Sequence, residues 1–210
     1  MEPYSDLQNL TLPNEAPVMI LPGVPLLPNA PLPLFIFEER YRLMLAHSLE
    51  RDRMFCVALM KPGVTDAVSA DDFFAVAGLG LIRACVGNPD GTSHLILQGL
   101  ARVEFTSFAQ EFPFRIARIR VLQSKDSETV QAVALGAKVL EICRSLKSAG
   151  HKTPPALDEY LPHLSNPGIL ADVVANALIE DPLQRQRVLE ELVVSDRLRV
   201  MIRYLSEQSA

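Results

Sequence analysis

Two side chains in the middle of the sequence could together perform nucleophilic catalysis. Cys85 and His94 flank Asn88–Gly91, whose residue types fit a type I turn closing a β-hairpin. Residues whose numbers sum to 179 would then lie opposite each other, which pairs the thiol with the imidazole. Such a pair can serve as nucleophile and base. Because no third orienting group and no oxyanion hole can be recognised, we expect no catalytic residues.

Other chemistry is not indicated by residue spacing. His47, His151 and His163 lack a partner at the spacing of metal ligands, so we expect no metal. The three cysteines are widely separated and form no CxxC motif, which excludes a zinc ribbon and a disulfide framework. We expect no cofactor.

The strongest candidate for binding a partner is the segment Phe35–Tyr41. An extended apolar stretch here meets the charged start of a helix, and such a junction can form a groove rim with aromatic anchors. We predict that Phe35, Glu38, Arg40 and Tyr41 bind a protein partner. The alternative is structural, with the aromatic rings fixing the helix to the core and Glu38 favouring the positive helix N-terminus.

Composition narrows the function classes. The chain has 210 residues, of which 49% are hydrophobic and 21% charged, as in ordinary globular proteins. Its 20 basic and 25 acidic residues are evenly spread, and tryptophan is absent, which argues against nucleic acid as a partner. The polar, acidic start does not resemble a secretory signal, and prolines interrupt the apolar stretches, so we expect no membrane partner and a cytoplasmic location.

The first 124 residues divide into a leader and a β-rich part. Residues 1–17 show no periodicity and are expected to be a flexible leader. Residues 18–37 are rich in proline, which indicates edge segments and turns rather than central strands. Residues 18–124 are predicted to form a barrel subdomain. After the proline-rich segment, it is expected to contain a helix at 38–50 and then an antiparallel meander with strands at 55–60, 73–86, 93–98, 102–108 and 114–122.

Residues 125–210 form a predicted helical subdomain. The helix that begins near Val130 has apolar stripes on two sides, one of them including Val133, so we expect it to lie between the barrel and the later helices. Three shorter helices follow, one of them capped by Asp181 with Pro182 at its first position. The predicted fold class is α+β: an antiparallel β-barrel with an inserted helix, followed by a C-terminal helical bundle.

Four groups of motifs, in order, carry a resemblance to a known family. They are Leu26–Tyr41, Gly78–Ile82 with Asp90-Gly91 and Ile96–Arg102, Phe112–Ile119, and Leu170–Asp172 continuing to Leu205. Together they resemble the N-terminal substrate-binding domain of ATP-dependent Lon proteases, and best the short stand-alone bacterial proteins built from that domain alone.

The resemblance implies a PUA-like β-barrel with a helical subdomain, and a role in holding unfolded or tagged proteins. The sequence contains no GxxxxGK[ST] phosphate loop and no stretch resembling the Lon Ser–Lys protease region, so we expect no enzyme activity. A partner protease or chaperone would process the bound protein. The chain departs from the family pattern at Asn29-Ala30 and Glu39, and at Phe35, where a His or Arg is common and where the surface becomes more apolar.

The sequence therefore predicts a non-enzymatic protein-binding module that holds unfolded or tagged polypeptide segments. Two alternatives remain open. One is an RNA-binding PUA-like module, which rests on fold analogy and is opposed by the acidic charge balance. The other is small-molecule binding in the cleft between barrel and helices.

Overall fold

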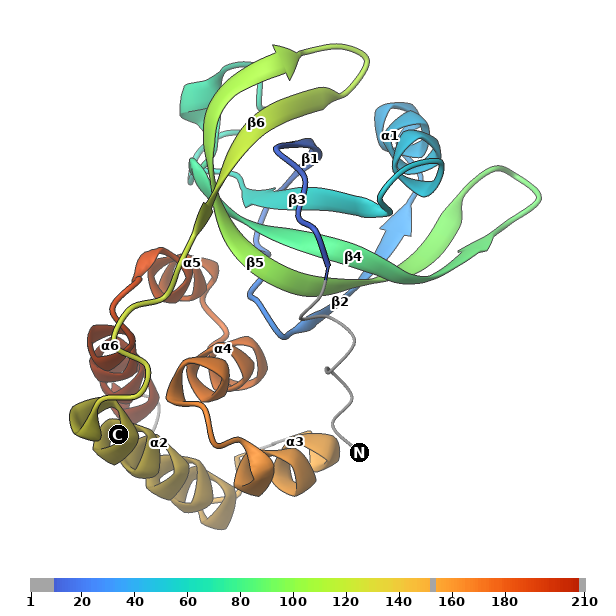
Figure 1. Ribbon diagram of the computed structural model, residues 1–210. Helices are drawn as coiled ribbons and strands as arrows, with labels where there is room; N and C mark the ends of the chain where they lie inside the picture. The colour runs from blue at the N-terminus through green and yellow to red at the C-terminus, as the bar shows by residue number, and fades with distance from the viewer. Residues whose placement is uncertain (1–9, 152–153, 208–210) are drawn as a thin grey trace.

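A computed structural model describes residues 10–151 and 154–207, and shows a β-barrel standing on a layer of helices (Figure 1). The strands are β1 Glu15–Leu21, β2 Pro31–Ile36, β3 Met54–Leu59, β4 Val76–Gly87, β5 Ser93–Gln110 and β6 Arg115–Leu122. The helices are α1 Glu39–Leu49, α2 Val130–Ser148, α3 Pro155–Tyr160, α4 Pro167–Leu178, α5 Pro182–Glu190 and α6 Val194–Glu207. The predicted fold class, α+β with a PUA-like barrel before a helical bundle, is confirmed. None of the described helices has the length and apolar character needed to cross a membrane.

The sheet closes on itself through one long strand. Its order is β2-β5-β4-β3-β1-β6, and a further pairing of β6 with β5 completes the barrel. Strand β2 lies outside the closed ring and pairs only with β5 among the described strands. Strands β1 and β3 are parallel, with Val18 opposite Cys56, whereas every other pair is antiparallel. The barrel is therefore not a simple meander.

The proline-rich beginning was predicted correctly for β2, which is an edge strand, and wrongly for β1. Strand β1 is a central strand between β3 and β6, and it already begins at Glu15, within the range expected to be leader. The N–H of Ile119 donates to the carbonyl of Asn14 (2.9 Å). The backbone N–H and C=O groups of Ala16 and Val18 therefore point toward β6, and those of Pro17 point away from it. A proline is tolerated there because pairing with β3 starts only at Val18. Residues 1–9 of the expected leader lie outside the described residues.

Two glycines allow the chain to cross the barrel closely. A Cβ atom at Gly78 would lie 2.1 Å from the carbonyl oxygen of Leu26, and one at Gly99 would lie 2.0 Å from that of Leu27. The segment between β1 and β2 can therefore pack directly on strands β4 and β5. The strands expected at 93–98 and 102–108 are one strand, because the backbone continues through Gly99 as part of β5.

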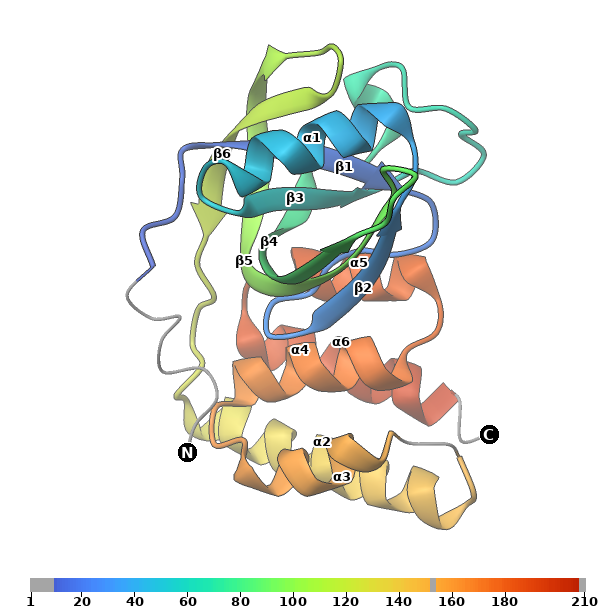
Figure 2. The same cartoon turned by 90° about the vertical axis from the view of Figure 1, so that its right-hand side faces the viewer.

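Helix α2 does not lie where its sequence suggested. Helices α4 and α5 face the barrel, while α2 and α3 form the far side of the molecule (Figure 2). Only one stripe of α2 is buried, and Val133 on the other stripe is 54% exposed. The inner position belongs to α4, whose buried face includes Leu170 and Val174. Leu27 and Ala30 from the barrel part join the helical core, so the division into separate subdomains stays a prediction.

Candidate functional site

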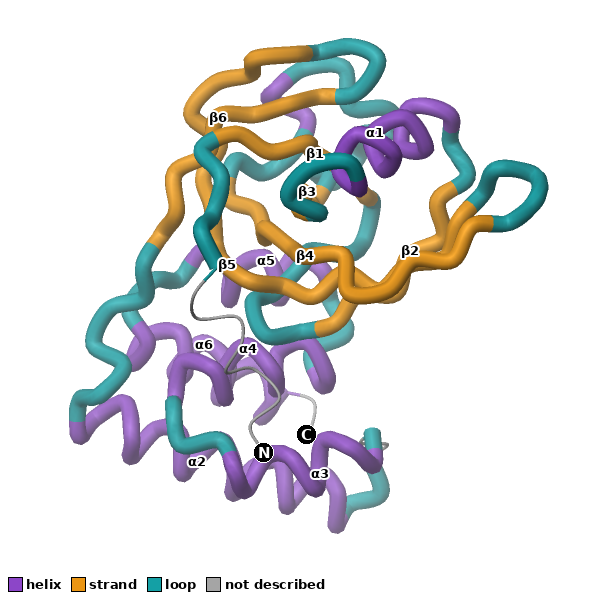
Figure 3. The backbone as a smooth tube through the Cα atoms, turned by 45° about the vertical axis from the view of Figure 1, so that its right-hand side comes forward, coloured by secondary structure: helices purple, strands orange, loops and turns teal. Residues whose placement is uncertain are grey.

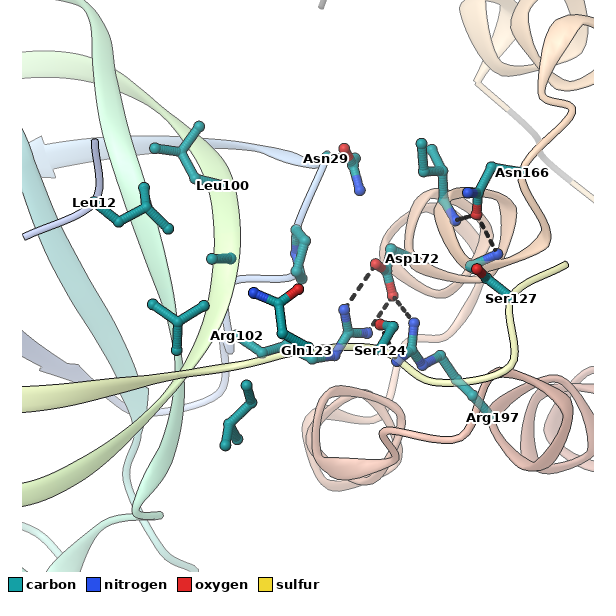
Figure 4. Close-up of a pocket in the computed structure, with 16 residues that line it drawn as sticks. Leu12, Asn29, Leu100, Arg102, Gln123, Ser124, Ser127, Asn166, Asp172 and Arg197 are labelled. Carbon is teal, nitrogen blue, oxygen red and sulfur yellow. Dashed lines mark hydrogen bonds and ion pairs between the residues drawn. The ribbon is translucent and has the colours of Figure 1, made fainter. Parts of the chain in front are cut away.

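Three charged side chains meet where the barrel rests on the helices (Figure 4). Arg102 comes from β5, Asp172 from α4 and Arg197 from α6, and their exposed fractions are 4%, 2% and 0%. Arg102 makes a two-pronged contact with the carboxylate: Nη1 donates to Oδ2 at 2.9 Å and Nη2 donates to Oδ1. Arg197 Nη1 lies 3.5 Å from the same Oδ1. One carboxylate thus holds two guanidinium groups from different elements.

The remaining bonds of the two arginines tie neighbouring segments together. Arg102 Nε donates to the carbonyl of Leu189 (2.9 Å), and Arg197 Nε donates to that of Glu191 (2.8 Å). Arg197 Nη2 donates to the hydroxyl of Ser124 in the connection between β6 and α2 (2.9 Å). Burial lowers the pKa of Arg197 to about 10, although the charge of Asp172 raises it, so this guanidinium remains charged at neutral pH.

A pocket of about 340 Å3 opens beside these three residues, lined by polar side chains such as Asn29, Gln123 and Asn166. Both oxygens of Asp172 are engaged by guanidinium groups, so the carboxylate is not available as a base. Both arginines are almost fully covered. We interpret the three charged residues as the connection that fixes the barrel on the helices rather than as a reactive centre.

A second surface feature lies on the outer face of β2, β5 and β4. The strand register places Phe35 beside His94 and Val86, and the next row holds Pro33 beside Ile96 and Ala84. We call these six exposed residues the apolar platform. They line an open hollow of about 450 Å3. Figure 3 shows the β4–β5 hairpin, with β2 along its base, extending beyond the barrel.

Phe35 is held in place although its side chain is 48% exposed. Its ring stacks on that of His94, with centroids 4.6 Å apart, and on that of Phe37, with centroids 5.9 Å apart. A ring that is already fixed loses little conformational entropy when a partner packs against it. The platform therefore presents a rigid aromatic anchor to the solvent.

Of the four predicted binding residues, only Phe35 lies on the apolar platform. Tyr41 is 6% exposed, and its hydroxyl donates to the carbonyl of Ile20 (3.0 Å) and accepts from the N–H of the same residue (3.2 Å). Burial raises the pKa of Tyr41, so the hydroxyl stays protonated at neutral pH. Arg40 pairs with Glu38 (2.9 Å) and covers the Tyr41 ring at 4.7 Å. The structural role considered for the helix start fits Tyr41, whereas binding by Glu38 and Arg40 stays a prediction.

Replacing Tyr41 by Phe distinguishes a structural role of Tyr41 from a role in binding a partner. We expect the free energy of unfolding to fall by about 1–3 kcal/mol, because two buried backbone groups of Ile20 lose their partner. Urea unfolding followed by circular dichroism measures the change. We also expect this variant, below its unfolding transition, to bind an unfolded polypeptide as the parent does. A loss of binding at unchanged stability would instead place Tyr41 in the binding site.

The hairpin register corrects the catalytic pair considered above. The expected β-turn is present, since Gly91 N–H donates to the carbonyl of Asn88 (3.0 Å). However, Asn88 N–H donates to the carbonyl of Thr92 (2.8 Å), so the loop holds one residue more than expected. Gly91, at a φ of 81°, supplies the left-handed residue that such a loop needs after its turn.

This one-residue shift moves the two side chains apart. Cys85 lies opposite Leu95, and His94 lies opposite Val86. Because a shift of one residue exchanges the faces of a strand, Cys85 packs against the core while His94 lies on the exposed platform. Among the described residues, no group of three His, Cys, Asp or Glu side chains is placed to hold a metal.

Sequence reasoning missed the three buried charged residues between the barrel and the helices. A signal was present, since Asp172 is the one acidic residue of α4 and lies within its apolar stretch 169–175. An acid in such a position needs a buried partner. The platform residues of β4 and β5 were also missed, because their common face depends on the hairpin loop, which is one residue longer than expected and shifts the register.

The architecture defines a class of protein first. A barrel with an inserted helix on a five-helix bundle is also the fold of the N-terminal domain of the Mycobacterium avium complex Lon protease, with a TM-score of 0.74 and 17% identity over 92% of this chain and 98% of that one. The Lon N-terminal domain protein from Xanthomonas campestris gives a TM-score of 0.65 and 20% identity, covering 90% and 98%.

The sequence then names the family. Residues 15–207 match the model of the ATP-dependent protease La (LON) substrate-binding domain, and the chain belongs to this family. Lon proteases of Dictyoglomus thermophilum and Geobacter metallireducens are 24% and 29% identical over 201 and 206 residues, which cover 96% and 91% of this chain. These matches cover 25% of each relative, so the chain spans a quarter of the length of either protease.

Proposed function

We propose that this chain is a substrate-recognition module that holds unfolded or tagged polypeptide segments on its apolar platform. The observation that carries the proposal is the solvent-exposed, pre-stacked Phe35 on an apolar face, in a chain whose family is a substrate-binding domain. Bound segments would pass to a protease or a chaperone, since the platform itself offers no reactive group.

The exposed apolar area supports binding of another chain. The platform and the neighbouring Phe37 form one contiguous patch of exposed, mostly apolar side chains, and the largest such patch of a monomeric protein is often functional. Covering such an area removes water from apolar atoms and favours association by roughly 25 cal/mol per Å2 before the costs of ordering are counted. Binding in the micromolar range is the expected result.

The basic residues of β6 do not favour RNA. Arg118 pairs with Glu15 (3.0 Å) and Arg120 pairs with Glu104, so both charges are already neutralised on the surface. Arg115 lies on the other face, between two phenylalanine rings and beside Glu111 (2.9 Å). A nucleic-acid site needs basic side chains free to neutralise phosphates.

The test is the binding of a labelled unfolded polypeptide, reduced and carboxymethylated α-lactalbumin, measured by fluorescence anisotropy at two salt concentrations. We expect Phe35→Asp to lower the affinity at least about tenfold, because a charge is placed in an apolar contact. Val133→Asp serves as the control, since Val133 is similarly exposed but lies on the far helix α2. Equal effects of the two substitutions would contradict the proposed site. Salt-sensitive binding of a structured RNA alone would favour the RNA-binding alternative.

A further inference from the structure

The open edge of β2 is unusual in its backbone chemistry. Gly99 N–H donates to the carbonyl of Ala30 (2.9 Å). This bond shows which residues of β2 direct their backbone N–H and C=O groups toward β5. Every second residue from Ala30 therefore turns its backbone groups toward β5. The residues between them, Pro31, Pro33 and Phe35, turn theirs toward the open edge.

Two of these three outward positions are prolines, which have no N–H group. The open edge consequently carries a single amide donor, that of Phe35. A chain that extends a sheet needs a donor at every second residue of the edge strand. Strand β2 therefore cannot accept a further strand along most of its length, and prolines on edge strands commonly have this effect.

We propose that a client polypeptide lies extended on the face of the apolar platform, along the direction of the strands, and is recognised by its side chains and not by strand addition to β2. This inference rests on the proposed function and states how that function is carried out. The two rows of the platform are two residues apart along the strands, which corresponds to about 6.8 Å. Same-face side chains of an extended client have this spacing, so residues i and i+2 can occupy both rows at once.

The two rows differ in what they fit. One row has the stacked rings of Phe35 and His94, which offer a flat surface to an aromatic or aliphatic side chain. The other has Ile96 between Ala84 and Pro33, and the small alanine leaves space in the hollow for a branched aliphatic group. The client class is thus an extended segment with an aromatic and an aliphatic residue two positions apart.

A second copy of this chain is a poorer occupant. A stable protein–protein interface contains about 20–30 residues on each partner, whereas the platform has six. The platform also cannot grow by pairing its edge with another β2, because the prolines of both edges would meet. The area matches a few side chains of one short segment.

Short labelled peptides test the inference. The parent peptide has Phe and Leu two positions apart in a Ser-rich background, and it is compared with isomers in which the two residues are adjacent or four apart. We expect the isomers to bind at least about tenfold more weakly than the parent, because only one side chain reaches the platform. A parent peptide with alternate backbone amides N-methylated should bind within about threefold of the unmodified one, since no ladder bonds are lost.

A protein variant supplies the matched control. Pro31→Val restores an outward N–H at a position that is not part of the platform, and we expect it to leave the affinity of the parent peptide unchanged. Strong loss of binding on N-methylation, or equal binding of all isomers, would overturn the inference. Either of these two results overturns only the mode of recognition if reduced and carboxymethylated α-lactalbumin still binds to the protein and Phe35→Asp abolishes that binding. If that polypeptide does not bind at all, the proposed function falls as well.

Discussion

Replacing Asp172 by Asn is expected to lower the free energy of unfolding by about 3–5 kcal/mol. The neutral amide would leave two guanidinium groups, those of Arg102 and Arg197, buried without a counter-charge. An amide also cannot accept hydrogen bonds on both of its polar atoms, so the two-pronged contact with Arg102 would be lost. Urea unfolding followed by circular dichroism gives the size of the effect.

Asp196→Asn is the matched control for this prediction. Asp196 also pairs with an arginine, Arg199, but both side chains are about half exposed on α6. Exposed pairs of this kind contribute less than about 1 kcal/mol. If Asp172→Asn costs no more than Asp196→Asn, the three charged residues do not fix the barrel on the helices.

Gly99→Ala is expected to cost about 3 kcal/mol, at the upper end of what overpacking usually costs. The added Cβ would lie 2.0 Å from the carbonyl oxygen of Leu27 and 3.2 Å from Pro28 Cα, so backbone atoms would have to move. The same movement would disturb the hydrogen bonds that Gly99 exchanges with Asn29 and Ala30. Thermal and urea unfolding both report the loss.

The control is Gly87→Ala, also in a strand of the same hairpin. A Cβ atom at Gly87 meets nothing closer than the Ser93 hydroxyl at 3.9 Å. Because alanine reduces the freedom of the unfolded chain, we expect this substitution to be neutral or to stabilise the protein by about 0.5 kcal/mol. Similar losses at both positions would show that close backbone approach at Gly99 is not what demands a glycine there.

Local sequence signals gave a sound account of local structure. The helix expected at 38–50 is α1, the turn at Asn88–Gly91 forms as predicted, and Asp181 caps α5 by accepting from two backbone N–H groups. Each of these features depends on residues within about one turn of each other, so its physical cause is visible in a short stretch.

The long-range features could not be obtained in this way. Parallel pairing of β1 with β3, the continuity of β5 through Gly99 and the inner position of α4 depend on contacts between distant segments. The candidate site shows the same division. Phe35 could be identified from an exposed aromatic beside a helix start, but its neighbours Val86 and Ile96 could not, because the hairpin loop is one residue longer than expected and shifts the register of β4 against β5.

The prolines of β2 also have a consequence for amide hydrogen exchange. Along the β2 ladder, the amides of Leu32, Leu34 and Ile36 face β5 and should exchange slowly, as ladder amides do. Phe35 supplies the only outward amide of this strand, and it lies on the open edge of the platform. One rapidly exchanging proton, framed by protected neighbours, would therefore distinguish the two modes of binding: strand addition at the edge would protect it, whereas a client on the face of the platform would leave it unprotected.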